Sequence, residues 1–142
     1  MQLIDRDYRG QGAFTMVELI IVVTLIGVMA LFAIPNYAKA INKAHEKDAT
    51  NNLMAIYASE KIYFNANNTY ATPALTDSTA HINTNLGLGI IPNGATYACP
   101  TGNAAAFDCR ADVGGTFVLK VTDLITPPCC FSGACPSAVA CS

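Results

Sequence analysis

Charged residues are scarce in this chain of 142 residues, and no cluster of basic residues occurs in it. Asp, Glu, Lys and Arg make up 13 % of the sequence, whereas soluble globular proteins carry about 25 %. The 8 basic and 10 acidic residues are scattered and leave a net charge of −2. A protein that follows the phosphates of a nucleic acid needs a basic cluster, so nucleic acid is not an expected partner.

Histidine is sparse, and the common catalytic motifs are absent. The two histidines, His45 and His81, lie 36 residues apart, and the sequence contains no GxxxxGK[ST], GxSxG or HExxH motif. Such motifs hold the phosphate, the nucleophile or the zinc ion of large enzyme classes. We therefore expect no catalytic residue, no cofactor and no metal, and the sequence favours a structural or binding protein over an enzyme.

Apolar residues, in contrast, make up 52 % of the chain. The 21 residues from Phe14 to Ile34 carry a single charge, Glu18. As a helix they span about 31 Å, which matches a bilayer core of about 30 Å, so this segment is predicted to cross a membrane. A charge inside such a segment is usually functional. Gly27 and Pro35 both weaken helices, because Gly is flexible and Pro has no N–H to donate.

The order of these features resembles the amino-terminal motif of type IV pilins and pseudopilins. A polar leader and the small residue Ala13 come before Phe14, and Glu18 follows four residues after Phe14. Gly27 and Pro35 lie at the spacings that the family has, and the resemblance covers about residues 10–40. It implies that residues 1–13 are a leader peptide, that a prepilin peptidase cleaves between Ala13 and Phe14, and that Phe14 is then N-methylated.

The residue before the cleaved bond departs from the family pattern. Pilins nearly always have Gly there, whereas this chain has Ala13, with Gly12 one residue earlier. Cleavage after Ala13 keeps the family's spacing between the new amino terminus and Glu18. Cleavage after Gly12 lengthens that spacing by one residue and stays open as an alternative.

The resemblance also implies how the subunits assemble. Glu18 attracts the new amine of Phe14 on a neighbouring subunit and sets the register of a filament, in which breaking the pair would strand a buried charge. The apolar residues 19–34 then bury against identical helices. The segment from Gly27 to Pro35 is expected to lose helical hydrogen bonds when the fibre is stretched. The implied partners are other copies of the chain, inner-membrane lipid, the peptidase and methylase, and the pilus assembly machinery.

Beyond residue 35 the pattern changes to that of an α+β head. Apolar residues recur with helical spacing over residues 36–64, which predicts an amphipathic helix with Glu46 and Glu60 on its polar faces. Residues 65–94 are expected to form a long connection with a short helix near residues 78–82. Strands are predicted over residues 95–99, 106–111 and 116–122, the last from its alternation of apolar and polar residues.

The predicted fold class is therefore α+β. A long helix, hydrophobic and then amphipathic, packs on a small antiparallel β-sheet of three or four strands, as in the type IV pilin fold, with a disulfide-closed C-terminal segment. The expected parts are a leader over residues 1–13, a transmembrane and filament-core helix over residues 14–35, and the head over residues 36–142. His45 is interpreted as a surface or interface residue.

Six cysteines lie in the last third of the chain: Cys99, Cys109, Cys129, Cys130, Cys135 and Cys141. An even number in a short chain indicates disulfides and an oxidising compartment. Cys99 and Cys109 are close enough in sequence to close a loop between strands, and the other four can form two bridges in the tail, with the adjacent pair not bonded to each other. Three prolines predict that this tail is irregular. The spacings do not match the paired Cys knuckles of zinc sites.

The resulting functional hypothesis is a structural subunit of a type IV pilus, held in the inner membrane with its head in the periplasm and then polymerised into an extracellular fibre. The first alternative is a major pseudopilin of a type II secretion system. The second is a soluble secreted disulfide protein, because Ala38-Lys39-Ala40 fits a signal-peptidase site. The missing basic region and the interruption by Glu18 argue against this second alternative.

Overall fold

The computed structural model describes residues 14–142, except for the side chains of residues 33–35. The leader and Ala13 lie outside the described residues. The chain divides into two compact units at the boundary between Tyr37 and Ala38, and each is described by itself. Helix α1 (Met16–Asn67) contributes to both units, because it continues without interruption through Gly27 and Pro35.

In the first unit, no other described residue covers α1. Every described side chain from Phe14 to Phe32 is exposed, including large apolar ones such as Ile26, Met29 and Leu31, which are 61 %, 70 % and 73 % exposed. A helix that is apolar on all sides is normally buried, either in lipid or among other helices. This run also has the length and composition of a membrane span. The first unit therefore presents the apolar surface that a membrane-crossing helix needs.

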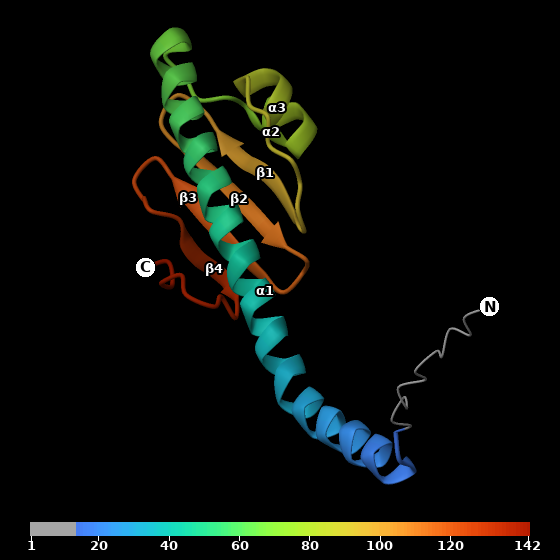
Figure 1. The fold of residues 1–142 in the computed structure, drawn as a ribbon. Helices are drawn as coiled ribbons and strands as arrows, with labels where there is room; N and C mark the ends of the chain where they lie inside the picture. Colours follow the sequence, from blue (N-terminus) through green and yellow to red (C-terminus); the bar gives the residue numbers. More distant parts are fainter. Residues whose placement is uncertain (1–13) are drawn as a thin grey trace, which may run out of the picture. The chain divides into compact units, whose positions relative to one another are not determined.

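In the second unit, the C-terminal part of α1 lies across a four-stranded sheet (Figure 1). The helix turns one face to the sheet: Ala49, Leu53, Ile56 and Glu60 are all fully buried. Their spacing of three and four residues is the helical period that the sequence showed. The helix continues three residues past Phe64, to Asn67.

The sheet is antiparallel, with strands in the order β1 (Ala95–Gly102), β2 (Phe107–Val113), β3 (Phe117–Thr122) and β4 (Cys129–Gly133). Alternate residues of the first three strands point to the helix and form the core, and the largest are Tyr97, Phe107 and Phe117. These three strands and the α+β fold class confirm the sequence prediction.

The fourth strand contradicts the prediction that the tail is irregular. Pro127 and Pro128 precede β4, so they remove no hydrogen-bond donor from its ladder with β3. Residues Cys129 and Cys130 pair with Lys120 and Leu119. Prolines directly before a strand therefore do not exclude the strand.

Two short helices, α2 (Pro73–Thr76) and α3 (Thr79–Leu86), occupy the connection between α1 and the sheet and lie beside β1 (Figure 1). Ser78 caps α3 by accepting a hydrogen bond from the amide of His81 at 3.3 Å, and Gly87 ends it in the left-handed conformation, with φ 66°. The hydroxyl of Thr79 accepts a hydrogen bond from the amide of Tyr97 at 3.0 Å. The helix expected near residues 78–82 is thus present, and it is longer than predicted.

Candidate functional site

The amino-terminal end of α1 is organised by a hydrogen-bonded pair, Thr15 and Glu18. The amide and the hydroxyl of Thr15 each donate to Oε2 of Glu18 at 2.8 Å, and the amide of Glu18 donates to the hydroxyl of Thr15 at 3.2 Å. This reciprocal pattern is a capping box, which starts a helix. It explains why α1 begins at Met16, two residues after Phe14. Sequence reasoning missed Thr15, although the T-x-x-E spacing is a readable signal.

The capping box holds the Glu18 carboxylate at the start of the helix. Phe14 immediately precedes Thr15 and its side chain is 81 % exposed. The carboxylate is therefore bonded to the backbone only one residue away from the amine that cleavage before Phe14 would create. Both of the Thr15 bonds end on Oε2, and among the described residues no hydrogen bond to Oε1 of Glu18 is formed.

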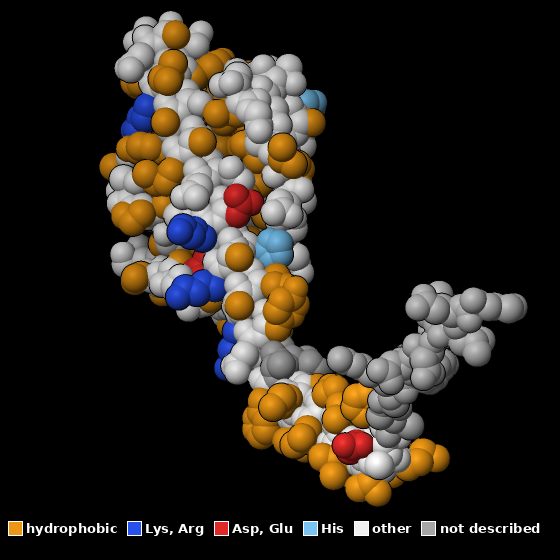
Figure 2. All heavy atoms as spheres, viewed as in Figure 1, with side chains coloured by type: hydrophobic (Ala, Val, Ile, Leu, Met, Phe, Trp, Pro, Cys, Tyr) orange, Lys and Arg blue, Asp and Glu red, His pale blue; other side chains and the backbone are white. Residues whose placement is uncertain are grey.

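The rest of this segment satisfies its polar groups internally. Figure 2 shows hydrophobic side chains over most of its visible surface. The hydroxyl of Thr24 donates to the carbonyl of Ile21 at 2.8 Å, and the amide group of Asn36 donates to the carbonyl of Phe32 at 3.2 Å. Internal satisfaction of polar groups is what a helix needs in a medium without water.

Gly27 and Pro35, the residues predicted to weaken the helix, both lie within helical backbone in this structure. A Cβ atom added to Gly27 would meet no atom within 4 Å, so neighbouring residues do not require a glycine there. Pro35 has no N–H, and the carbonyl of Leu31 therefore lacks its ordinary helical donor. The structure thus leaves the expected weakening under load as a prediction about the fibre.

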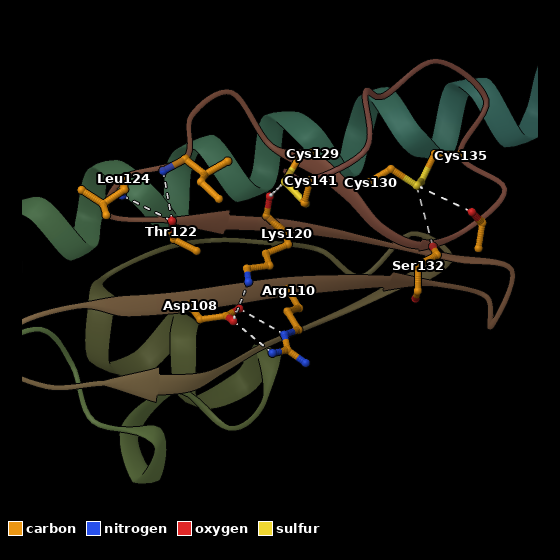
Figure 3. Close-up of a disulfide and its surroundings, with 12 residues drawn as sticks. Asp108, Arg110, Lys120, Thr122, Leu124, Cys129, Cys130, Ser132, Cys135 and Cys141 are labelled. Carbon is orange, nitrogen blue, oxygen red and sulfur yellow. Dashed lines mark hydrogen bonds and ion pairs between the residues drawn. A yellow bond between two sulfur atoms is a disulfide. The ribbon is translucent and has the colours of Figure 1, made fainter.

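In the head, all six cysteines are paired. The bridges join Cys99 to Cys109, Cys129 to Cys141 and Cys130 to Cys135. The first links neighbouring strands β1 and β2, and the other two close the C-terminal tail, with adjacent Cys129 and Cys130 bonded to different partners. Figure 3 shows the two tail bridges beside β3 and β4.

The tail is also held by a buried carboxylate on α1. Glu46 is 2 % exposed, and it accepts hydrogen bonds from the amide of Ser137 at 3.0 Å, the hydroxyl of Ser137 at 2.8 Å and the amide of Ala138. The sequence prediction that Glu46 and Glu60 lie on polar faces is wrong. Both are buried because they accept hydrogen bonds from backbone amides of other segments. Glu46 bonds to the C-terminal tail, and Glu60 bonds to Ala71 in the chain that follows α1.

The outer face of the sheet carries a compact cluster of charges (Figure 3). Arg110 donates to both oxygens of Asp108, at 3.1 and 3.0 Å, and Lys120 lies 3.3 Å from the same carboxylate. The guanidinium carbon of Arg110 lies 4.4 Å from the ring centroid of Phe131. The hydrogen bonds to Asp108 raise the pKa of Arg110, so this group stays charged.

The histidines occupy separate surroundings in the head. His45 is half-buried and packs close to the backbone of Gly94, which agrees with its interpretation as a surface or interface residue. His81 is exposed, and its Nδ1 lies 2.6 Å from a carboxylate oxygen of Asp77, which precedes α3. A hollow of about 600 Å³ beside the tail is lined by Lys43, Lys47 and Glu46, among other residues. The carboxylate of Glu46 already accepts three hydrogen bonds from Ser137 and Ala138 of the tail.

Comparison with known proteins agrees with this organisation. A family model, the prokaryotic N-terminal methylation motif, matches residues 8–34. The type IV major pilin protein PilA of Myxococcus xanthus is 30 % identical over 119 residues, which are 84 % of this chain and 46 % of that protein. The chain thus spans about half the length of the curated relative that it matches.

An exposed apolar helix long enough to cross a membrane, the amino-terminal motif and the disulfide-closed α+β head together point to a structural protein. The chain resembles the type IV pilin and pseudopilin superfamily in its methylation motif and in its similarity to a type IV major pilin.

Proposed function

We propose that this chain is a structural subunit of a type IV pilus. Residues 1–13 are removed by a prepilin peptidase, Phe14 becomes the N-methylated first residue, residues 14–35 anchor the subunit in the inner membrane, and residues 36–142 form the periplasmic head. Assembly machinery then moves the subunit from the membrane into an extracellular fibre made of copies of itself.

The observation that carries this proposal is the exposed apolar surface of residues 14–32, most of which lie in α1. Such a surface cannot face water, because each square ångström of exposed apolar area costs about 25 cal/mol. Lipid covers it before assembly, and identical helices replace the lipid in a fibre. Close packing of Val, Ile and Leu then takes over from lipid contact, so the same sequence serves in both environments.

Glu18 supplies specificity in this otherwise apolar interface. A carboxylate buried without a partner is strongly disfavoured, so subunits settle where Glu18 meets the amine of Phe14 on a neighbour. The capping bonds from Thr15 support this role, because they hold the carboxylate near the helix start before a neighbour arrives. Gly27 and Pro35 would then mark the part of the helix that yields when the fibre is pulled.

The tail favours a pilus over a secretion pseudopilus. Two disulfides and the Glu46 anchor hold the C-terminal segment against the head, and a disulfide-closed segment resembles pilins more than major pseudopilins. A segment that is exposed outside the cell gains from covalent closure, because the bridges restrict its unfolded states.

The proposal is tested by Glu18→Gln in the producing cell, with Thr24→Val as the matched control in the same helix. Fibres sheared from the cells and the membrane pool are both quantified by immunoblot. We expect Glu18→Gln to leave the membrane pool intact and to reduce sheared fibre at least tenfold, whereas Thr24→Val changes neither. Wild-type fibre yield from Glu18→Gln would refute the assembly role of this carboxylate.

A further inference from the structure

A second buried carboxyl group in the head, that of Glu60, has no part in membrane anchoring or in subunit assembly. Glu60 on α1, Cys99 on β1 and Cys109 on β2 are each 0 % exposed. A carboxylate oxygen of Glu60 and the two sulfur atoms all lie within 4.8 Å of one another. Among the described residues, this is the one group of three or more acidic, cysteine or histidine side chains gathered so closely.

Only one of the two carboxyl oxygens of Glu60 accepts a hydrogen bond from the described residues. Oε2 accepts a hydrogen bond from the amide of Ala71 at 3.0 Å, while Oε1 has no donor among the described residues. A glutamine has the same size and an oxygen that accepts the same bond, so the fold does not need an ionisable group here. Burial of an unpaired carboxyl group is costly. An acid kept at this place is better explained by proton transfer than by packing.

We propose that Glu60 accepts the proton of a cysteine thiol when the Cys99–Cys109 disulfide closes. The oxidant is a disulfide compound, and the first cysteine to react forms a mixed disulfide with one half of it and releases the other half as a thiol. The remaining cysteine thiol passes its proton to the Glu60 carboxylate. The resulting thiolate attacks the cysteine sulfur of the mixed disulfide and forms the Cys99–Cys109 bond. The bond from that cysteine to the oxidant breaks, and the second half of the oxidant leaves as a thiolate that takes a proton from water. Two cysteine thiols are oxidised and one oxidant disulfide is reduced to two thiols.

The geometry links this step to packing of the head. The β1–β2 hairpin brings Cys99 and Cys109 together by strand pairing alone. Glu60 reaches the sulfur atoms only when α1 lies on the sheet, where Leu53 and Ile56 enter the core. Because the thiolate is the reactive form of cysteine, closure speeds up as the helix docks. Glu60 is thus a proton acceptor for folding, independent of whether the mature subunit forms a pilus or a pseudopilus.

The test follows disulfide formation in the full chain in detergent micelles. Reduced protein is refolded with glutathione disulfide in the presence of EDTA between pH 5 and 8.5, free thiols are trapped with N-ethylmaleimide, and each bridge is quantified by peptide mass spectrometry. At neutral pH, Glu60→Gln is expected to slow closure of Cys99–Cys109 at least about tenfold, a modest effect for a general base. The two tail bridges serve as internal references.

The pH profile separates proton transfer from a packing effect. The rate to follow is the conversion of the mixed disulfide to the Cys99–Cys109 bridge, because Glu60 acts in that step alone. In the wild-type chain this rate rises as the Glu60 carboxyl group ionises and then levels off. In Glu60→Gln it continues to rise about tenfold per pH unit toward the ordinary pKa of a thiol, about 8.5. Asp48→Asn, which removes an acidic group from the same helix, should leave the Cys99–Cys109 profile unchanged.

Three results would overturn the proposal. One is an equal rate and profile for Glu60→Gln and the wild type. Another is equal slowing of all three bridges, which indicates a general folding defect. The third needs no variant: a wild-type rate of conversion of the mixed disulfide that rises to pH 8 without levelling off would show that the second thiol ionises without help from a carboxylate.

Discussion

Loss of the Glu46 anchor should destabilise the head and release its tail. Glu46→Ala removes the acceptor of three hydrogen bonds, two of them from backbone amides of Ser137 and Ala138. Each bond to a charged group contributes at least about 1 kcal/mol, and amides left buried without an acceptor add a desolvation cost. We expect a decrease of about 3 kcal/mol in the free energy of unfolding for Glu46→Ala. For Glu46→Gln, which keeps one oxygen, we expect about half of that.

The measurement is urea unfolding of the full chain in detergent micelles, with all disulfides intact. Asp48→Asn is the control, because Asp48 lies two residues along the same helix and forms no side-chain hydrogen bond in the described part of the chain; its effect should stay within about 0.5 kcal/mol. Hydrogen exchange at residues 136–140 should speed up in Glu46→Ala alone. An unfolding free energy equal to that of Asp48→Asn, with unchanged exchange in the tail, would show that the carboxylate does not hold the tail.

Three further predictions concern the head. Burial raises the pKa of Glu60, so the folded head binds a proton at this carboxyl group more tightly than the unfolded chain does. The free energy of unfolding, measured with urea between pH 4 and 8, should therefore fall as the pH rises through the raised pKa. Glu60→Gln should remove this decrease. Leu53→Ala, at a fully buried position, should lower the unfolding free energy by about 3 kcal/mol in the same assay, and a change below about 1 kcal/mol would contradict the core assignment. Gly102→Ala would push a Cβ atom into the carbonyl of Ala71 and should lower the thermal midpoint, whereas Gly89→Ala, with open space around it, should not; equal midpoints would contradict the close approach.

The elements with a local signal could be predicted from the sequence. The apolar run of α1, its amphipathic continuation and the alternating strand β3 each carry their periodicity within a short window. The motif around Phe14 and Glu18 is equally local. The role of Thr15 was predictable in the same way, because its spacing from Glu18 is that of a capping box.

The features that escaped prediction depend on distant partners. Glu46 is buried because Ser137, 91 residues away, bonds to it, and Glu60 is buried because the chain folds back so that Ala71 meets it. On a helical projection both look like ordinary polar residues. The pairing of the four tail cysteines likewise depends on a distant partner. Cys129 and Cys130 lie in β4, and β4 is held in place by its hydrogen bonds to β3.

The proposed processing and assembly are best tested by the intact mass and the amino-terminal sequence of the mature protein, first without reduction and then after it. We expect a chain that starts at N-methylated Phe14. We also expect a gain of six mass units on reduction, because each of the three disulfides takes up two hydrogens. A mature chain that starts at Ile41 would contradict assembly into a fibre, because the helix that anchors and polymerises the subunit would have been discarded.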